Sequence, residues 1–193
     1  MDGQMKPPGF HGAESRRTMA PAPARFYDLI LRLVALLLTL AAAVVIGADK
    51  QTKTVPLQLA AALPPLYVPV TARWHYLSAL VYFVVANAIG CSYAALSLLL
   101  SAVNKGRSRS LRSAIIVMDI LTVALLFSGV GAAAAVGVIG RNGNSHLKWN
   151  KICNVFGRFC GQGAASLLLS LLGATSFLSL VVLAALRLLI EFK

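Results

Sequence analysis

Long apolar stretches alternate with short polar segments along this chain. Four blocks carry almost no charge, and they cover residues 29–48, 77–103, 113–140 and 159–186. About 20 apolar residues at 1.5 Å rise per residue cross a hydrocarbon layer roughly 30 Å thick. None of the blocks has the polar face of a surface helix, so lipid and neighbouring helices surround each of them. The pattern therefore predicts four membrane-spanning helices.

The segments between the blocks indicate how the chain is threaded. We expect a disordered tail over 1–28, outer loops over 49–76 and 141–158, and an inner loop over 104–112. The inner loop has four basic residues in nine positions, and short basic loops stay on the cytosolic side. Both termini are then cytosolic. The predicted fold is an all-α membrane protein, a four-helix transmembrane bundle over 29–190 with two extracellular loops.

Composition narrows the class of protein. Of the 193 residues, 58% are hydrophobic and 12% are charged, whereas a soluble domain has about 25% charged residues. The formal charge of +12 would suit a nucleic-acid partner if the basic residues formed a stripe on one face. They lie between the apolar blocks instead, so we exclude a soluble enzyme and a nucleic-acid-binding domain.

Two ionisable residues lie inside the predicted spans. Arg32 follows the start of the first span by a few residues, and Asp119 lies six residues into the third. Both spans run outward from the cytosol, so the two side chains lie at similar depths, about 6 and 9 Å. A lone charge at a helix centre costs about 2.5–3.5 kcal/mol on insertion scales, and pairing offsets this penalty. We predict an intramembrane ion pair between Arg32 and Asp119.

Other arrangements of these two residues stay open. The Arg32 side chain is long enough to reach the headgroups by itself. Asp119 is too short for that, but a protonated carboxyl or hydrogen bonds to Ser113 or Thr122 would also suit it. A proton relay would need more titratable partners, and we expect none on the second and fourth spans.

Small and polar residues mark positions of helix packing. Small residues at four-residue spacing allow helix backbones to approach closely. Two such stripes occur, Gly129, Ala133 and Gly137 in the third span and Ser166, Ser170 and Ala174 in the fourth. The two stripes are compatible with packing within one bundle and also with association between copies of the protein. Asn87, in the middle of the second span, is predicted to donate a hydrogen bond to another helix.

Two cysteines, Cys153 and Cys160, lie seven positions apart at the second outer loop. The outside of a cell is oxidising, so a loop that folds back allows a disulfide between them. Closing this eight-residue ring would stabilise the loop by roughly 2.5 kcal/mol on the chain-entropy model. Two free thiols are the alternative, and a zinc site is disfavoured because His146 is the only nearby imidazole.

The chain lacks the residue sets of common catalytic sites. We find no paired carboxylates, Ser/His/Asp set or metal-binding cluster, and the three histidines, His11, His75 and His146, are scattered. We therefore expect no catalytic residue, no metal and no cofactor, and a protein that is not an enzyme.

Several segments together resemble one protein family. They are Phe26-Tyr-Asp-Leu-Ile-Leu-Arg32, residues 82–89, Met118-Asp119 with its Ala/Gly-rich continuation, and residues 143–153 with Phe159-Cys160. From about Tyr27 to the C-terminus, the chain resembles the plant Casparian strip membrane domain proteins, specifically the CASP-like branch of this MARVEL-like, four-span family. The resemblance implies cytosolic termini, a plasma-membrane location, and homo- and hetero-oligomers with related four-span proteins. It also implies a pair of membrane charges, which Arg32 and Asp119 match.

The resemblance also implies a function. Casparian strip members form immobile membrane platforms that exclude diffusion and recruit lignin-depositing enzymes to the wall. They have a short Glu-(Ser/Thr)-Leu-Pro-Phe-Phe-type signature where this chain reads Lys53-Thr-Val-Pro-Leu-Gln-Leu-Ala60. We therefore expect general scaffold behaviour here and not the strip-specific role.

The leading hypothesis is a non-enzymatic plasma-membrane scaffold that self-associates and organises local cell-wall modification. Besides the lipid bilayer, its partners would be wall polymers or wall-modifying enzymes, contacted by basic outer loops. The aromatic candidates for that contact are Tyr67, Trp74, Tyr76, Trp149, Phe156 and Phe159. The alternative is a channel or transporter subunit with a pore formed in the oligomer, for which Arg32, Asn87 and Asp119 are few polar residues.

Overall fold

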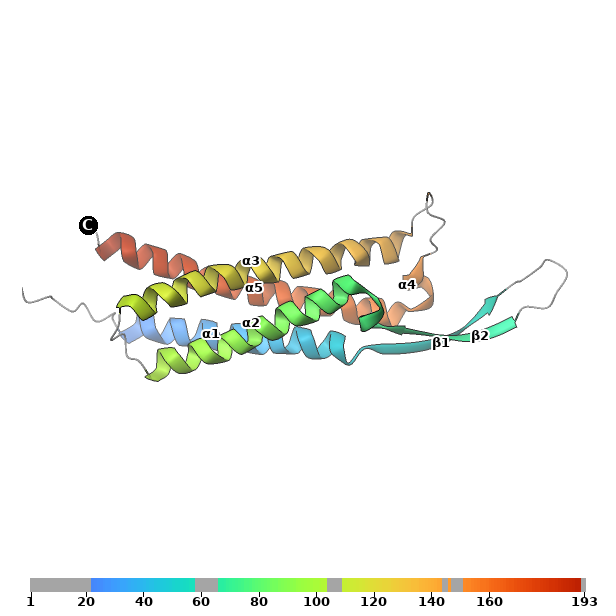
Figure 1. The fold of residues 1–193 in the computed structure, drawn as a ribbon, viewed down its shortest axis with the longest axis horizontal. Coiled ribbons are helices and arrows are strands. Elements are labelled where there is room, and N and C mark those ends of the chain that lie inside the picture. Colours follow the sequence, from blue (N-terminus) through green and yellow to red (C-terminus); the bar gives the residue numbers. More distant parts are fainter. Residues whose placement is uncertain (1–21, 58–65, 104–108, 144–145, 147–150, 192–193) are drawn as a thin grey trace, which may run out of the picture.

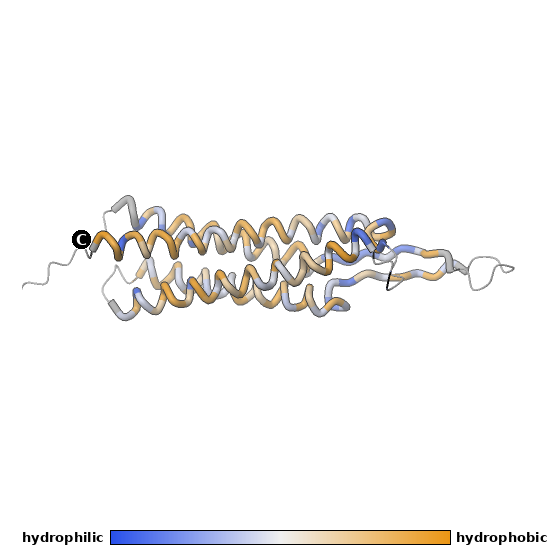
Figure 2. Tube along the Cα trace, turned by 90° about the horizontal axis from the view of Figure 1, so that it is seen from above, coloured by the Kyte–Doolittle hydropathy of each residue, from blue (hydrophilic) through white to orange (hydrophobic). Residues whose placement is uncertain are grey.

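Four long helices lie side by side in one elongated bundle (Figure 1). The computed structural model describes residues 22–57, 66–103, 109–143, 146 and 151–191. Each of the four helices is long and apolar enough to cross a membrane. The expected four-helix membrane bundle is therefore confirmed, and Figure 2 shows apolar residues along most of the length of these helices.

The helices are longer than the apolar blocks at most of their ends. They are α1 (Ala22–Gly47), α2 (Ser78–Val103), α3 (Arg109–Asn142) and α5 (Gly157–Glu191). The tail prediction is wrong for residues 22–28, because α1 already begins at Ala22, and the rest of the tail lies outside the described residues. Pro23 suits the first turn of a helix, where its missing N–H has no intrahelical partner to lose. Helix α3 ends before Gly143, whose φ of 71° gives the left-handed conformation common after a helix.

The four helices alternate in direction around a ring. Helix α1 packs on α2 and α5, and α3 packs on the same two helices. As a result, α1 lies diagonally across from α3, and α2 lies diagonally across from α5. The start of α1 and the end of α5 lie at the same end of the bundle (Figure 1). We refer to this as the terminal end, and to the opposite end as the hairpin end.

An antiparallel β-hairpin projects from the hairpin end, and sequence analysis did not predict it (Figure 1). Strand β1 (Lys50–Leu57) pairs with β2 (Leu66–Arg73), with Lys50 opposite Arg73, and the 3-10 helix η1 (Trp74–Tyr76) leads into α2. The Thr52 and Thr71 hydroxyl oxygens lie 3.0 Å apart across the strands. The Gln51 Oε1 atom accepts a hydrogen bond of 2.9 Å from the backbone N–H of Phe159. This bond joins the base of the hairpin to the first turn of α5.

The predicted disulfide is confirmed. Cys153 lies in the short helix α4 (Ile152–Val155), and its sulfur is bonded to that of Cys160 in the first turns of α5. The Cα atoms of the two cysteines lie 5.6 Å apart. The disulfide fixes the connection between α3 and α5 at the hairpin end.

Apolar side chains fill the bundle in two clusters. One lies toward the hairpin end and includes Ile46, Leu80, Phe83 and Ala133. The other includes Ala35, Ala94, Leu126 and Phe177. Helices α1 and α5 come close together at Gly173, where a Cβ atom would lie only 3.0 Å from the Thr39 methyl carbon. A larger side chain at this position would therefore require the Thr39 side chain or one of the helices to shift.

We predict that Gly173→Val destabilises the bundle by about 2 kcal/mol, the range expected for overpacking a close contact. Gly161→Val is the matched control, because Gly161 lies in the same helix and has nothing within 4 Å of the position of a new Cβ. Unfolding in mixed micelles titrated with SDS would compare the two variants. Equal stability of the two variants would contradict the close approach of α1 and α5 at Gly173.

Candidate functional site

Arg32 and Asp119 meet in the interior of the bundle. The Arg32 Nη1 atom donates to Asp119 Oδ1 at 3.2 Å, and Nη2 donates to Oδ2 at 3.0 Å. Arg32 is 3% exposed and Asp119 is 2% exposed, so both charged groups are buried. The guanidinium and the carboxylate therefore form a bidentate ion pair between α1 and α3, which lie diagonally across the bundle.

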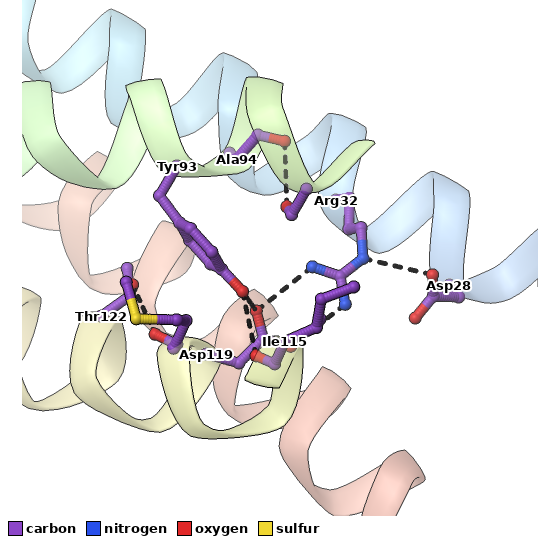
Figure 3. A network of polar contacts seen from close by, with 9 residues as sticks. Asp28, Arg32, Tyr93, Ala94, Ile115, Asp119 and Thr122 are labelled. Atoms are coloured by element: carbon purple, nitrogen blue, oxygen red, sulfur yellow. Dashed lines mark hydrogen bonds and ion pairs between the residues drawn. The ribbon is translucent and has the colours of Figure 1, made fainter. Parts of the chain in front are cut away.

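Two further side chains complete the charged group (Figure 3). Asp28, one turn earlier in α1, accepts a hydrogen bond of 3.2 Å from Arg32 Nε. The Tyr93 hydroxyl of α2 donates to Asp119 Oδ1 at 2.7 Å, with the Ile115 carbonyl oxygen as a second acceptor at 3.0 Å. We call Asp28, Arg32, Tyr93 and Asp119 the charged network.

The charged network lies at one level and touches every long helix. Arg32 lies ten residues after Ala22, Asp119 ten after Arg109, and Tyr93 ten before Val103. Ten residues of helix correspond to about 15 Å, measured from the terminal end of the bundle. The Tyr93 ring also packs on Phe177 of α5, with ring centroids 6.0 Å apart. All four long helices therefore meet at this level.

The geometry explains why two charges are tolerated there. A buried ion pair recovers its desolvation penalty only when its remaining donors and acceptors are also satisfied. Arg32 directs Nε to Asp28 and both terminal nitrogens to Asp119, and Asp119 receives a third donor from Tyr93. Removing one charge would leave the other buried beside fewer partners. The network therefore fixes how the helices are rotated about their axes.

The surroundings of the Arg32–Asp119 pair differ from those expected from the sequence. Thr122 donates to the Met118 carbonyl oxygen of its own helix and not to Asp119, and Ser113 is exposed. A titratable group on the second span does contact Asp119, because Tyr93 belongs to α2. The burial of Arg32 also excludes a side chain that reaches the headgroups.

Asn87 does not make the predicted hydrogen bond to another helix. Its Nδ2 atom donates to the Phe83 carbonyl oxygen of α2 itself, at 2.9 Å. The Asn87 side chain is fully buried, and its Oδ1 atom has no hydrogen-bond partner among the described residues. Only the amide nitrogen of Asn87 is therefore hydrogen-bonded among the described residues, and its partner lies on the same helix.

The predicted small-residue stripes pack mainly inside the bundle. Gly129 is buried against α2, where a Cβ atom would lie 3.2 Å from Ala86 Cβ, and Ala133 belongs to the apolar cluster at the hairpin end. Ser166, Ser170 and Ala174 of α5 are buried as well. Gly137 is exposed, and a Cβ atom added there would meet nothing within 4 Å, so it takes no part in this packing.

The outer aromatic residues do not form one contact surface. Phe156 and Phe159 are buried in the apolar cluster at the hairpin end, so their assignment to partner contacts is wrong. Their rings close the end of the bundle beside the disulfide. Trp74 is partly buried against the same cluster, and Trp149 lies outside the described residues. Tyr67 and Tyr76 are exposed near the hairpin.

A second buried acid, Asp49, lies where α1 joins the hairpin. Asp49 is 2% exposed, and neither carboxylate oxygen has a hydrogen-bond partner among the described residues. It lines a cavity of about 270 Å³ together with Arg73, Trp74 and His75. Burial raises the pKa of Asp49, and the positive charge of Arg158 partly opposes this. Within the described residues, no group of three His, Cys, Asp or Glu side chains is placed to hold a metal ion.

We predict that Arg32→Met and Asp119→Leu each destabilise the protein by about 3 kcal/mol, because each leaves a buried charge without its partner. The double variant should be within about 1 kcal/mol of the original protein, because it leaves no unpaired charge between α1 and α3. Unfolding with SDS in mixed micelles would measure the free energy of unfolding of the original protein, the two single variants and the double variant. Additive losses in the double variant would show that the two residues do not interact.

Tyr93→Phe tests the third helix of the network. We expect it to cost about 1 kcal/mol in the original protein, as for other hydrogen bonds inside membranes. It should cost close to nothing in the Asp119→Leu background, where the Tyr93 hydroxyl keeps only the Ile115 carbonyl oxygen. The same loss in both backgrounds would contradict a contact between Tyr93 and Asp119. Charge reversal is a poorer test, because Arg32→Asp places a carboxylate four residues from Asp28.

We predict that Asp49→Asn stabilises the protein at neutral pH. The folded state raises the pKa of Asp49, so it favours the protonated carboxyl and loses stability as the pH rises through that pKa. An amide never ionises, so the gain should be present at pH 7.5 and shrink toward pH 4. Thermal unfolding across this range would measure it. A gain that is independent of pH, or a loss at pH 7.5, would contradict the raised pKa.

Comparison with known proteins gives one consistent result. The model of the Casparian strip membrane protein domain matches residues 21–176. CASP-like protein 1E2 of Glycine max is 60% identical over 168 residues, which are 87% of this chain and 90% of that protein. CASP-like protein 1E2 of Vitis vinifera is 57% identical over 180 residues, 91% of this chain and 92% of that protein. No solved structure matches the chain.

A relative from a third plant also carries the name CASP-like protein. CASP-like protein 1E1 of Arabidopsis thaliana is 51% identical over 162 residues, which are 83% of this chain and 85% of that protein. The domain match contains both partners of the buried ion pair and the disulfide. The resemblance found in the sequence is confirmed. The chain belongs to the Casparian strip membrane protein domain family, and over most of its length it is similar to the CASP-like proteins.

Proposed function

We propose that this chain is a non-enzymatic scaffold of the plasma membrane that self-associates through α3. The observation that carries the proposal is a stripe of small residues on the outward face of this helix. Its members are Ala124, Ser128, Gly131 and Ala135, and all four are exposed. They recur at spacings of four, three and four residues, so they lie along one side of the helix. We call them the outer stripe.

The outer stripe lies on the exposed side of α3, whereas Gly129 and Ala133 lie on the side of the same helix that is buried in the bundle. A Cβ atom added at Gly131 would meet nothing within 4 Å, so the backbone is open to a partner there. In a bilayer, small residues let two helix backbones come close and gain van der Waals contact. Ser128 also accepts a hydrogen bond from the Tyr82 hydroxyl at 3.1 Å. A second copy of α3 or the α3 of a related four-span protein would fit this face.

The charged network supports a scaffold more than a channel. Within the described part of the bundle, apolar clusters and the network occupy the space between the helices. The two charged side chains that a conduction path could use, Arg32 and Asp119, are already paired with each other. A bundle of this kind serves as a rigid unit for lateral assembly. The family description refers to a membrane protein domain, and neither it nor the names of the relatives mentions a catalytic activity.

The hairpin end would then face the wall, with both termini in the cytosol. Exposed basic side chains gather there, and they are Lys50, Lys53, Arg141, Lys151 and Arg158. Their field attracts acidic polymers over about one Debye length, roughly 8–10 Å at ordinary salt. We therefore assign acidic wall polysaccharides, or enzymes that modify them, as the outer partners. The hairpin would hold these partners clear of the membrane surface.

Self-association can be measured with labelled protein in lipid vesicles. Energy transfer between copies should rise with the protein-to-lipid ratio, and Gly131→Leu should weaken the association at least tenfold, equal to about 1.4 kcal/mol. Gly137→Leu is the matched control, because Gly137 is exposed on another side of the same helix. Equal association of both variants and the original protein would refute the α3 face.

A fluorescent fusion in plant cells tests the scaffold itself. We expect laterally clustered protein at the plasma membrane that recovers slowly after photobleaching. Gly131→Leu should recover faster, and Gly137→Leu should recover like the original. Freely mobile, unclustered protein, or ion currents in reconstituted vesicles, would contradict the scaffold proposal.

A further inference from the structure

A groove separates α1 from α5 at the terminal end of the bundle. Its volume is about 580 Å³, and its lining includes Tyr27 and Ile30 of α1 and Leu183, Leu186, Arg187 and Ile190 of α5. Apart from the phenol and the guanidinium, these side chains are hydrocarbon. The groove thus combines a long apolar floor with one basic group.

The groove follows from the way these two helices cross. They touch closely at Gly173, where a Cβ would lie 3.0 Å from Thr39. Toward the end of α5, beyond Gly173, the large apolar side chains of Leu183, Leu186 and Ile190 line the groove. From Leu183 to Ile190 the helix rises about 10 Å, so the groove runs along several methylene groups of an extended chain.

The charges at this end favour an anionic occupant. Among the residues whose side chains the structure describes, the ends of α1, α3 and α5 carry Arg25, Arg112 and Arg187 against Asp28. The Asp28 carboxylate is already bound to the Arg32 guanidinium. Basic pockets between membrane helices bind anionic headgroups, and further basic residues near a charged surface strengthen this attraction.

We infer that this groove binds one anionic phospholipid. An acyl chain lies between α1 and α5 along Leu183, Leu186 and Ile190. The phosphate lies at the terminal end, within reach of the Arg187 guanidinium and the Tyr27 hydroxyl. A zwitterionic lipid fills the same apolar floor, but the cationic part of its headgroup meets repulsion from the surrounding arginines. Charge selectivity is therefore the specific property of this site.

The leaflet that the groove faces depends on the topology given under the proposed function. Binding of the lipid to the groove does not depend on that topology. With cytosolic termini, the groove opens into the inner leaflet, whose surface is negative. The bound lipid would stabilise the contact between α1 and α5, whereas the outer stripe lies on α3. Self-association and lipid binding are thus separate properties of the molecule.

Native mass spectrometry of the purified full chain in detergent tests the inference. The probes are phosphatidylglycerol and phosphatidylcholine with identical acyl chains. We expect one phosphatidylglycerol to bind at least tenfold more tightly than phosphatidylcholine, and high salt to reduce the difference. Equal binding of the two lipids would overturn the inference.

Two variants locate the site. Leu186→Trp fills the groove and should abolish the tight binding of phosphatidylglycerol. Leu172→Trp is the matched control, because Leu172 lies on the same helix outside the groove with nearly equal exposure, 54% against 51% for Leu186. Loss of binding in both variants, or in neither, would overturn the placement.

Substitutions of Arg187 test whether its positive charge contributes to the preference for phosphatidylglycerol. Arg187→Gln should reduce the preference for phosphatidylglycerol to about that for phosphatidylcholine, while Arg187→Lys should retain most of it. Unchanged selectivity in Arg187→Gln would overturn the role of this arginine. Gly131→Leu should bind lipid like the original protein, so failure of the lipid site and failure of self-association can be told apart.

Discussion

The arrangement of this protein depends on one buried guanidinium and the groups that surround it. Arg32 binds Asp119 from across the bundle and Asp28 from its own helix. Tyr93 connects the same carboxylate to α2, and its ring reaches Phe177 of α5. A charge left unpaired at this depth is costly, so any arrangement that separates these helices is disfavoured. Apolar packing alone has no such specificity, because lipid tails are as apolar as leucine side chains.

Pairing the polar groups inside the bundle leaves its outer faces to lipid and to other proteins. The inward side of α3 carries Gly129 and Ala133, and the outward side carries the outer stripe. Helix α3 thus presents small residues in two directions: one set packs within the bundle, and the other is the face that we propose for contact with a neighbouring protein. At the hairpin end of the bundle, the disulfide and the hydrogen bond of Gln51 connect the loops to the helices. A rigid bundle with the proposed self-association face and a projecting hairpin would be a suitable unit for membrane platforms.

The sequence predicts the spans, the disulfide and the pairing of Arg32 with Asp119 because each depends on simple physical rules. Apolar length defines a span, and two opposite charges at similar depth attract each other. Tyr93 was missed because its ring looks apolar, although a hydroxyl inside an apolar block also needs a partner. The hairpin was missed although Thr and Val residues recur in both strands, a weak signal beside the strong apolar blocks. Burial of Phe156 and Phe159 depends on how α4 turns back, which no local pattern reveals.

Solid-state NMR in lipid bilayers tests the central claim most directly. Protein labelled with ¹³C at aspartate carboxyls and ¹⁵N at arginine guanidinium groups would report the distance between the two kinds of group. The account predicts that the Asp119 carboxyl, identified by its loss in Asp119→Asn, lies in direct contact with an arginine nitrogen, as the 3.0 Å separation of Nη2 and Oδ2 requires. An Asp119 signal without nearby arginine nitrogen would contradict the account.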